Sequence, residues 1–310
     1  MKFISFEDAD SKLSWTEMAD ALEAGHKLDR AEIGDLLLSK QDRSLLSRAA
    51  WIDGLGIALK SVTVFPENPA KTPPEPTVQG AMLIFGSENG ALEAIVDGPL
   101  VTKWKTAGDS VLGARLLARK DAATYLVIGA GTVAKSLFQA YSEVFPGLTR
   151  FLIWNRTRQK AEQLAEEMQQ VGLAVEVADD LAIAVGEADI ISTATMAKSP
   201  VLRGEWVRPG THVDLIGAYR PDMREADDDL LLKGSLFVDS RETTIGEIGE
   251  LIIPMQAGVI SADHVKGDFM DLCNGAEGRV SDEEITVFKN GGGAHLDLMT
   301  GAMIVRRSGA

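Results

Sequence analysis

A short apolar run that breaks into a glycine-rich turn constrains the fold of this chain more than any other feature. Tyr125–Ile128 is rich in β-branched and apolar residues, and Gly129-Ala130-Gly131-Thr132-Val133-Ala134 then leads into a helical pattern. Strand, turn and helix in this order form the unit that binds dinucleotides. Gly129 permits a sharp turn, Gly131 lets the backbone approach a pyrophosphate, and the small Ala134 lets helix and strand pack closely. Gly129, Gly131, Thr132 and Val133 are therefore the first candidates for cofactor contacts, although a glycine-rich turn can also be purely structural.

The end of the next strand indicates which dinucleotide is bound. Arg150–Trp154 is followed by Asn155, Arg156 and Thr157, where NAD-binding units usually carry an acidic residue for the ribose 2′-hydroxyl. A guanidinium and a hydroxyl instead offer charge-assisted hydrogen bonds to a 2′-phosphate. The pattern favours NADPH, and it leaves open both the use of NADH and a basic helix start without a ligand.

Composition excludes several other classes of protein. With 310 residues, 45% of them hydrophobic, the chain is long enough for two domains, and its net charge of −15 argues against nucleic acid or an anionic membrane surface as partner. One cysteine excludes an internal disulfide, and the four histidines lack metal-ligand spacing. We therefore expect no metal site. The charged N-terminus and the absence of a long apolar run predict a cytoplasmic protein.

Hydrophobic periodicity divides the chain into a sheet domain and a doubly wound domain. A helix is expected at 15–24, then strands at 35–39, 44–52, 57–65, 80–85 and 92–96 around an ordered proline-rich loop at 66–76, and a helix at 100–119. Beyond Ile128, strands at 150–154, 174–177, 189–194, 211–216 and 235–238 accompany helices at 157–170 and 180–185, and the pattern turns helical again from about Ser281. We predict a Rossmann doubly wound parallel sheet at 114–285, and a smaller α+β substrate-binding and dimerisation domain from 1–113 with 286–310.

Several separated motifs resemble the ornithine cyclodeaminase and mu-crystallin family, over most of the chain. They are Val62-Thr63-Val64-Phe65-Pro66-Glu67-Asn68-Pro69, Pro76-Thr77-Val78-Gln79-Gly80, Lys105-Thr106-Ala107, Val127-Ile128-Gly129-Ala130-Gly131, Gly217-Ala218-Tyr219-Arg220-Pro221-Asp222-Met223-Arg224-Glu225 and Phe288-Lys289. The resemblance implies a homodimer in which the sheet domain carries the substrate and the Rossmann domain presents the nicotinamide. The family includes enzymes of several activities, so membership alone does not fix the reaction.

The resemblance also implies catalytic residues. The family's active-site lysine falls on Lys60, and the arginine that grips the substrate carboxylate is replaced by Lys105, which keeps the charge and loses the bidentate fork. Arg48 is the candidate that compensates for a second family arginine, although a surface arginine on an edge strand is the alternative. By analogy with the fold, Thr106 and Gly292 approach the nicotinamide. Thr193, Ala194, Thr195, Met196, Ile216 and Gly217 line the dinucleotide crevice.

Positions at which the sequence departs from the family pattern narrow the range of reactions that the chain could catalyse. Tyr219 occupies the place where ornithine cyclodeaminases carry an aspartate, so cyclisation of ornithine loses its base. The stretches 46–54 and 100–110 are similar to reductases of 1-pyrroline-2-carboxylate, which form L-proline, and the six-membered analogue giving pipecolate fits the same mechanism. The alternatives are a dehydrogenase of alanine or an N-alkyl amino acid, a cyclodeaminase, and a non-catalytic binder of NADPH and a ligand, as mu-crystallin suggests.

Overall fold

The computed structural model describes residues 2–309, and the chain divides into two compact units. Unit 1 contains the residues up to Lys105 together with those from Gly293 onward, and unit 2 contains Thr106–Gly292. The expected boundaries at 113 and 286 therefore lie inside unit 2. Among the described residues, no helix combines the length and the apolar character that crossing a bilayer requires.

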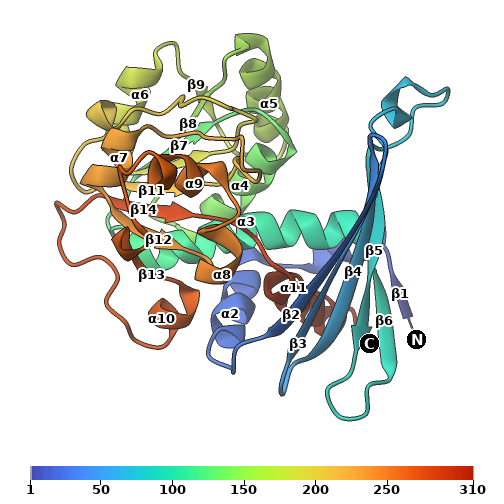
Figure 1. Ribbon diagram of the computed structural model, residues 1–310. Helices are drawn as coiled ribbons and strands as arrows, with labels where there is room; N and C mark the ends of the chain where they lie inside the picture. The colour runs from blue at the N-terminus through green and yellow to red at the C-terminus, as the bar shows by residue number, and fades with distance from the viewer. Residues whose placement is uncertain (1, 310) are drawn as a thin grey trace. The chain divides into compact units, whose positions relative to one another are not determined.

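Unit 1 is built on a six-stranded sheet in the order β1-β6-β5-β4-β3-β2, as Figure 1 shows. Its strands are antiparallel except for the parallel pair of β1 and β6. The strands are β1 (Lys2–Ile4), β2 (Glu32–Lys40), β3 (Arg43–Ile52), β4 (Gly56–Val64), β5 (Val78–Phe85) and β6 (Leu92–Asp97), and the helices are α1 (Phe6–Ala9), α2 (Trp15–Gly25) and α11 (Ala294–Arg307), with the first part of α3 (Gly98–Leu117). The short 3-10 turns η1 (Asp10–Lys12) and η2 (Asn68–Ala70) lie in its loops.

Helix α11 covers one face of this sheet. It packs on β3, β4 and α2, and its residues from Ala294 to Thr300 are buried. Gly301 permits the close approach, because a Cβ there would lie 2.2 Å from the Met82 side chain on β5. Register places Arg48 of β3 directly opposite Lys60 of β4, so both side chains point to the face that α11 covers.

Unit 2 is an eight-stranded parallel sheet in the order β13-β12-β14-β11-β10-β7-β8-β9. Its strands are β7 (Thr124–Ile128), β8 (Arg150–Trp154), β9 (Glu176–Val177), β10 (Ile190–Thr193), β11 (His212–Leu215), β12 (Ser235–Val238), β13 (Val265–Gly267) and β14 (Thr286–Lys289). The helices are α4 (Thr132–Val144), α5 (Arg158–Gln170), α6 (Leu181–Glu187), α7 (Asp228–Lys233), α8 (Arg241–Thr244), α9 (Gly249–Gln256) and α10 (Phe269–Cys273), with η3 (Gly204–Trp206) and η4 (Ala262–His264). This architecture confirms the predicted class, a Rossmann-type parallel sheet with a second, smaller domain.

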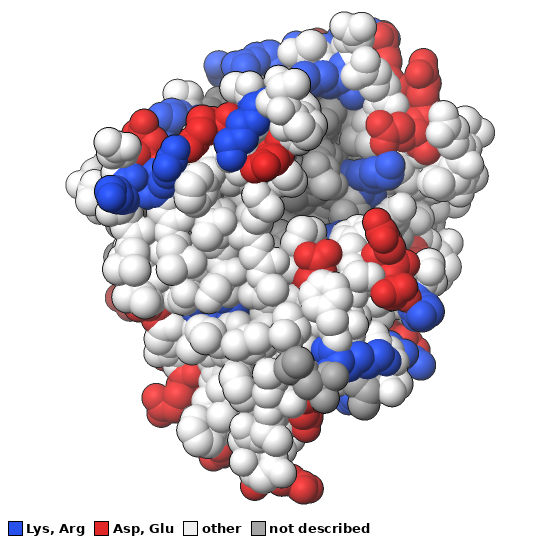
Figure 2. Space-filling model, turned by 90° about the vertical axis from the view of Figure 1, so that its right-hand side faces the viewer, with Lys and Arg blue, Asp and Glu red and all other residues white. Residues whose placement is uncertain are grey.

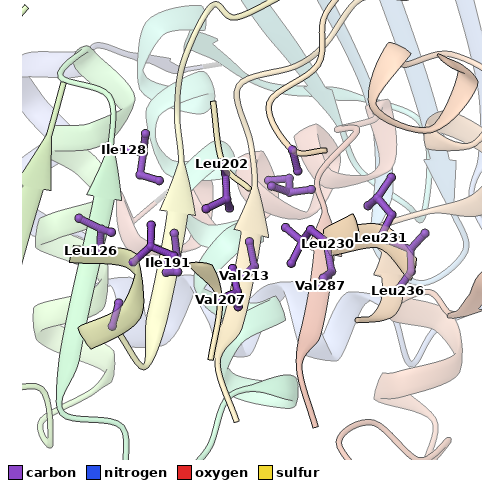
Figure 3. Close-up of a cluster of buried hydrophobic side chains, with 14 of the residues drawn as sticks. Leu126, Ile128, Ile191, Leu202, Val207, Val213, Leu230, Leu231, Leu236 and Val287 are labelled. Carbon is purple, nitrogen blue, oxygen red and sulfur yellow. The ribbon is translucent and has the colours of Figure 1, made fainter. Parts of the chain in front are cut away.

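The core of unit 2 is formed by apolar residues from neighbouring strands of its sheet. Leu126, Ile191, Val213 and Val287 come from four neighbouring strands and are fully buried, as Figure 3 shows. Because the sheet is buried on both faces, its strands carry apolar residues without regular alternation with exposed polar ones, and β11 also buries two polar residues, His212 and Asp214. The helices that follow the strands complete this core, with Leu230 of α7 among the buried residues.

One expectation about the C-terminal region is wrong. The pattern predicted helix from about Ser281, but Thr286–Lys289 forms β14, which lies between β11 and β12. All four of its residues are buried, so the apolar content that resembled a helix reflects a strand covered on both faces. The final helix begins only at Ala294.

Candidate active site

The turn after β7 opens a cavity of about 550 Å³ in unit 2. Gly129 adopts φ +120°, and a Cβ at this position would lie 2.4 Å from the Ala194 carbonyl oxygen, so glycine is required for the fold itself. Gly131 begins α4 as its N-cap, and a Cβ there would meet no heavy atom of the described residues within 4 Å. A side chain at Gly131 would therefore project into open space, where a ligand can approach the backbone.

The cavity is lined by residues that follow β7, β8 and β10. They are Gly129, Ala130, Gly131, Trp154, Asn155, Arg156, Thr157, Lys160, Ala194, Thr195, Met196, Ala197, Pro200 and Val201. Two of these side chains are basic and none of these described residues is acidic. The parallel sheet thus brings together the predicted turn, the predicted ribose-reading segment and the predicted segment 194–196.

The basic side chains of this segment differ in whether they pair with acidic residues. Arg158 is held by Glu162 and by Asp179, whose contacts raise the pKa of its guanidinium, and it does not line the cavity. Arg156 lines the cavity and forms no ion pair with another described residue. Asn155 donates from its amide to the Thr157 carbonyl at 2.8 Å, which fixes the turn that presents Arg156.

Glu225 fastens the strand ends beside the cavity. Its Oε1 accepts from the backbone N–H and the hydroxyl of Thr195, at 2.8 and 2.7 Å. Its Oε2 accepts from the Thr193 hydroxyl at 2.8 Å and from the Gly217 N–H at 2.6 Å. Burial raises the pKa of Glu225, while the hydrogen bonds from Thr195 oppose this shift. The carboxylate ties the end of β10 to the residues that follow β11, which sets the shape of this wall.

Other predicted cofactor residues lie outside the cavity lining. Thr132 and Val133 occupy the first turn of α4, Thr193 and Gly217 contact Glu225, and Ile216 is buried beside them. Thr106 and Gly292 are the first and last residues of unit 2, and the Gly292 N–H donates to Asp239 Oδ2. Lys160 was not predicted, although its position four residues after Arg156 could have indicated a second cation.

A cluster of charged side chains is buried in unit 1. Lys60 Nζ donates to Asp297 Oδ1 at 3.0 Å, and Lys105 Nζ lies 3.3 Å from the same oxygen. Arg48 lies opposite Lys60 and pairs with Asp35 at 2.8 Å. The alternative of an edge strand is wrong, because β3 lies between β2 and β4, and the Arg48 side chain is 31% exposed. The structure thus brings together the three residues that were predicted to be catalytic.

The charges of this cluster shift one another's protonation. Burial lowers the pKa of Lys60, with Lys105 and Arg48 adding to the effect and Asp297 opposing it. Burial alone would raise the pKa of Asp297, but the Lys105 and Lys60 ammonium groups bring it below its ordinary value. The pKa of the neighbouring His295 falls to about 3 through burial, with His26 and Lys105 contributing. Near neutral pH, His295 is therefore uncharged and Asp297 is a carboxylate.

Asp297 is the residue that sequence reasoning missed. It lies in the apolar stretch that begins α11, where the sequence predicted a final helix without assigning this residue a role. An aspartate on the buried face of a helix needs cationic or hydrogen-bonding partners. That signal was present in the sequence, but the partners are 237 and 192 residues away along the chain, so only the fold identifies them.

The chain matches one protein family over most of its length. The family model described as "Ornithine cyclodeaminase/mu-crystallin family" matches residues 41–308. A Delta(1)-pyrroline-2-carboxylate reductase of Paracoccus denitrificans is 54% identical, covering 98% of this chain and 96% of that protein. A ketimine reductase mu-crystallin of Mus musculus is 36% identical, covering 74% of this chain and 69% of that protein.

Solved structures share the whole fold. The Delta(1)-pyrroline-2-carboxylate reductase of Thermococcus litoralis, in complex with NADH and L-proline, aligns with a TM-score of 0.89 at 29% identity and covers 99% of this chain and 97% of its own. An archaeal alanine dehydrogenase dimer with bound NAD also aligns with a TM-score of 0.89, at 27% identity, over 98% of this chain and 95% of its own.

Proposed function

This chain belongs to the ornithine cyclodeaminase/mu-crystallin family, and on that premise we propose that it is an oxidoreductase that reduces a cyclic imino acid. The proposed substrate is 1-pyrroline-2-carboxylate, the product is L-proline, and the reductant is a nicotinamide cofactor. The observation that carries the proposal is the pair of lysines on Asp297, in a chain that is 54% identical to a protein named for this reaction. Reduction of 1-piperideine-2-carboxylate to L-pipecolate is the six-membered counterpart.

The residues of unit 2 fit a dinucleotide. Gly131 leaves open space where a pyrophosphate needs close access to the backbone, and it lies at the N-terminus of α4, whose first N–H groups favour an anion. Thr132 and Val133 would contribute backbone N–H groups from the same turn. The cavity beside this turn has a volume of about 550 Å³, which is suited to a cofactor. When bound, a reduced nicotinamide supplies the hydride that the C=N carbon of the substrate accepts.

We assign a preference for NADPH to Asn155, Arg156 and Thr157. Arg156 and Lys160 place positive charge at the cavity, and a carboxylate that would repel a 2′-phosphate is not among the described lining residues. The Thermococcus litoralis relative contains NADH, so NADH is the second cofactor to be compared. Ala194, Thr195 and Met196 would line the crevice, with Thr193, Ile216 and Gly217 behind them, and Thr106 and Gly292 would face the nicotinamide.

We assign the substrate carboxylate to Lys60, Lys105 and Arg48. Lys60 and Lys105 contact the buried carboxylate of Asp297, and Arg48, which lies opposite Lys60, pairs with a second carboxylate, Asp35. With Lys60, Lys105 and Arg48 positive and Asp297 and Asp35 negative, the cluster has one positive charge in excess, which a substrate carboxylate would balance. Holding the ring by its carboxylate fixes the C=N carbon relative to these residues, which lowers the barrier through orientation.

We propose that the protein acts as a homodimer through the outer face of the six-stranded sheet. This face, opposite the one that α11 covers, carries Leu36, Leu38 and Trp51, which are 53%, 55% and 51% exposed. Figure 2 shows the side of β1, β5 and β6, where uncharged side chains form a broad area and charged groups gather mainly toward its margins. Exposed apolar side chains such as those of Leu36, Leu38 and Trp51 favour burial against a partner. The archaeal alanine dehydrogenase relative is described as a dimer, so a second copy of this chain is the proposed occupant.

Oxidation of NADPH, followed at 340 nm, tests the proposed reaction. Purified protein is given 1-pyrroline-2-carboxylate, 1-piperideine-2-carboxylate, or pyruvate with ammonia, and L-ornithine is offered with NAD in a separate arm. The proposal expects rapid oxidation with the cyclic imines and little with pyruvate and ammonia. Turnover of pyruvate or ornithine alone would assign the chain to another reaction of its family, and silence with every substrate would favour a binding protein.

A further inference from the structure

The Asp297 carboxylate uses only one of its two oxygens for protein contacts. Lys60 and Lys105 both engage Oδ1, at 3.0 and 3.3 Å. Oδ2 is buried and has no hydrogen-bond partner among the described residues. A buried carboxylate oxygen without a donor is unfavourable, because it has lost water without gaining a replacement. The cluster therefore contains an acceptor that only a further group can satisfy.

The same cluster also contains unused donors. Each lysine ammonium carries three N–H groups, and the contacts recorded for the Lys60 and Lys105 ammonium groups are those to Asp297. The two side chains remain 11% and 13% exposed, whereas that of Asp297 is 2% exposed. The two lysine side chains are thus partly accessible to an anion, whereas the carboxylate that they contact is buried.

The charged groups and histidines around Asp297 come from several elements of unit 1. Lys60 is on β4, Lys105 is on α3, and Arg48 on β3 is paired with Asp35 on β2. His295 on α11 and His26 after α2 pack edge to face at 5.6 Å between ring centroids. His295 is neutral at pH 7, and Asp297 is the carboxylate in contact with the two lysines.

A cyclic imino acid matches this arrangement of donors and acceptor. Its ring nitrogen and its carboxylate are bonded to the same carbon, so a ligand carboxylate on the lysines brings the nitrogen close to Asp297. The terminal torsion of an aspartate is broad, which lets the carboxylate turn an oxygen toward a ligand N–H. A carboxylic acid that lacks the N–H would fill the donors and leave the buried acceptor without a partner.

We infer that Asp297 accepts the N–H of the substrate's ring nitrogen in its protonated, iminium form and thereby selects imino and cyclic amino acids over other carboxylates. This inference rests on the proposed function and adds a catalytic residue to it. A carboxylate beside the protonated nitrogen stabilises the cationic form of the imine, which is the more electrophilic form. The same contact holds the protonated nitrogen of the product, L-proline.

Binding of two nearly isosteric ligands tests the inference. L-proline and (S)-tetrahydrofuran-2-carboxylate differ in that the second has a ring oxygen in place of the protonated nitrogen. Their dissociation constants are measured by calorimetry on the cofactor-saturated full chain, for the wild type, Asp297→Asn and Thr300→Val. Thr300 is the matched control, since it lies on the same helix and its hydroxyl also has no partner among the described residues.

The wild type is expected to bind L-proline at least about tenfold more tightly than the oxygen analogue, since one charge-assisted hydrogen bond separates them. Asp297→Asn should bring the two dissociation constants within about threefold of each other through weaker binding of L-proline, and Thr300→Val should keep the wild-type ratio.

If Asp297→Asn weakened the binding of both ligands equally, Asp297 would only position the lysines, and the inference would be overturned. The inference would also be overturned if the wild type reduced the imine yet bound both ligands equally. This comparison uses the wild type alone, so it does not depend on the folding of any variant. A wild type that neither reduces the imine nor binds L-proline would overturn the proposed function as well.

Discussion

Lys60 and Asp297 meet at 3.0 Å, although one lies on a strand of the N-terminal sheet and the other lies on the final helix. The pair shows why the C-terminal helix belongs to unit 1: it supplies the carboxylate that the lysines of β4 and α3 need. A buried lysine and a buried aspartate are each unfavourable alone, and their contact offsets part of that cost: Asp297 opposes the lowering of the Lys60 pKa by burial, and the two lysines bring the pKa of Asp297 below its ordinary value.

Replacement of Lys60 tests its assignment to the substrate carboxylate. Lys60→Met keeps the side-chain length and removes the charge, so kcat/KM for the imino acid should fall about ten- to hundredfold or more. The KM for the cofactor should change less than about twofold. Steady-state kinetics with each reactant varied in turn measures both values. Lys71→Met, at an exposed lysine paired with Glu75, is the control and should behave as the wild type.

Two glycines of the same turn should respond to alanine in opposite ways. Gly131→Ala adds a Cβ into open space, so the unfolding free energy without cofactor should stay within about 0.5 kcal/mol of the wild type, while the cofactor KM rises several-fold. Gly129→Ala forces a side chain against Ala194 at φ +120° and should destabilise the fold by about 1 kcal/mol or more. Urea titration and cofactor kinetics on both variants make the comparison. An unchanged cofactor KM in Gly131→Ala would place the pyrophosphate elsewhere.

The cofactor preference rests on Arg156. Arg156→Ala should raise the KM for NADPH about tenfold or more and that for NADH less than twofold, because only NADPH carries the 2′-phosphate. Arg158→Ala is the control, since Glu162 and Asp179 already engage that guanidinium. Initial rates with both cofactors measure the effect. Equal increases for NADPH and NADH would remove the role assigned to Arg156.

The sequence predicted the Rossmann unit well because its signals are local. The Gly129–Ala134 turn and the apolar strands carry their information within a few residues, and the parallel sheet follows from their alternation. The region after Ser281 was harder, since a four-residue buried strand has no periodicity that distinguishes it from a helix. Lys60 and Lys105 were recognised through family resemblance. Asp297 was missed because its meaning depends on partners that only the tertiary structure brings together.

The outer face of the six-stranded sheet should control assembly. Leu36→Glu places a charge in the middle of an exposed apolar strand and should shift the protein from dimer to monomer. Sedimentation velocity at micromolar concentration measures the mass. Ile183→Glu, at a residue of α6 that is 63% exposed, is the matched control and should leave the mass unchanged. A wild type that sediments as a monomer would contradict the proposed dimer.

Buried histidines should make the fold sensitive to acid. The pKa of His212 falls to about 3, mainly through burial and also through Arg279. The unfolded chain binds a proton near pH 6.5 and the folded protein does not, so stability is fully present above pH 6.5 and is lost as the pH falls toward 3. His295 acts in the same direction. Each group contributes up to about 1.4 kcal/mol per pH unit in that window.

Urea unfolding at pH 7 and pH 5 measures this dependence. His212→Asn should lose less stability between the two values than the wild type, because one of the two contributions is gone. An identical pH dependence in the variant would show that His212 does not carry it.

Conversion of 1-pyrroline-2-carboxylate to L-proline tests the central claim most directly. Purified protein is incubated with the imine and NADPH, cofactor oxidation is followed at 340 nm, and the product is identified by chiral chromatography. The account predicts one L-proline for each NADPH oxidised, with the rate reduced in Lys60→Met. Absence of L-proline, or oxidation of NADPH that is independent of the imine, would contradict it.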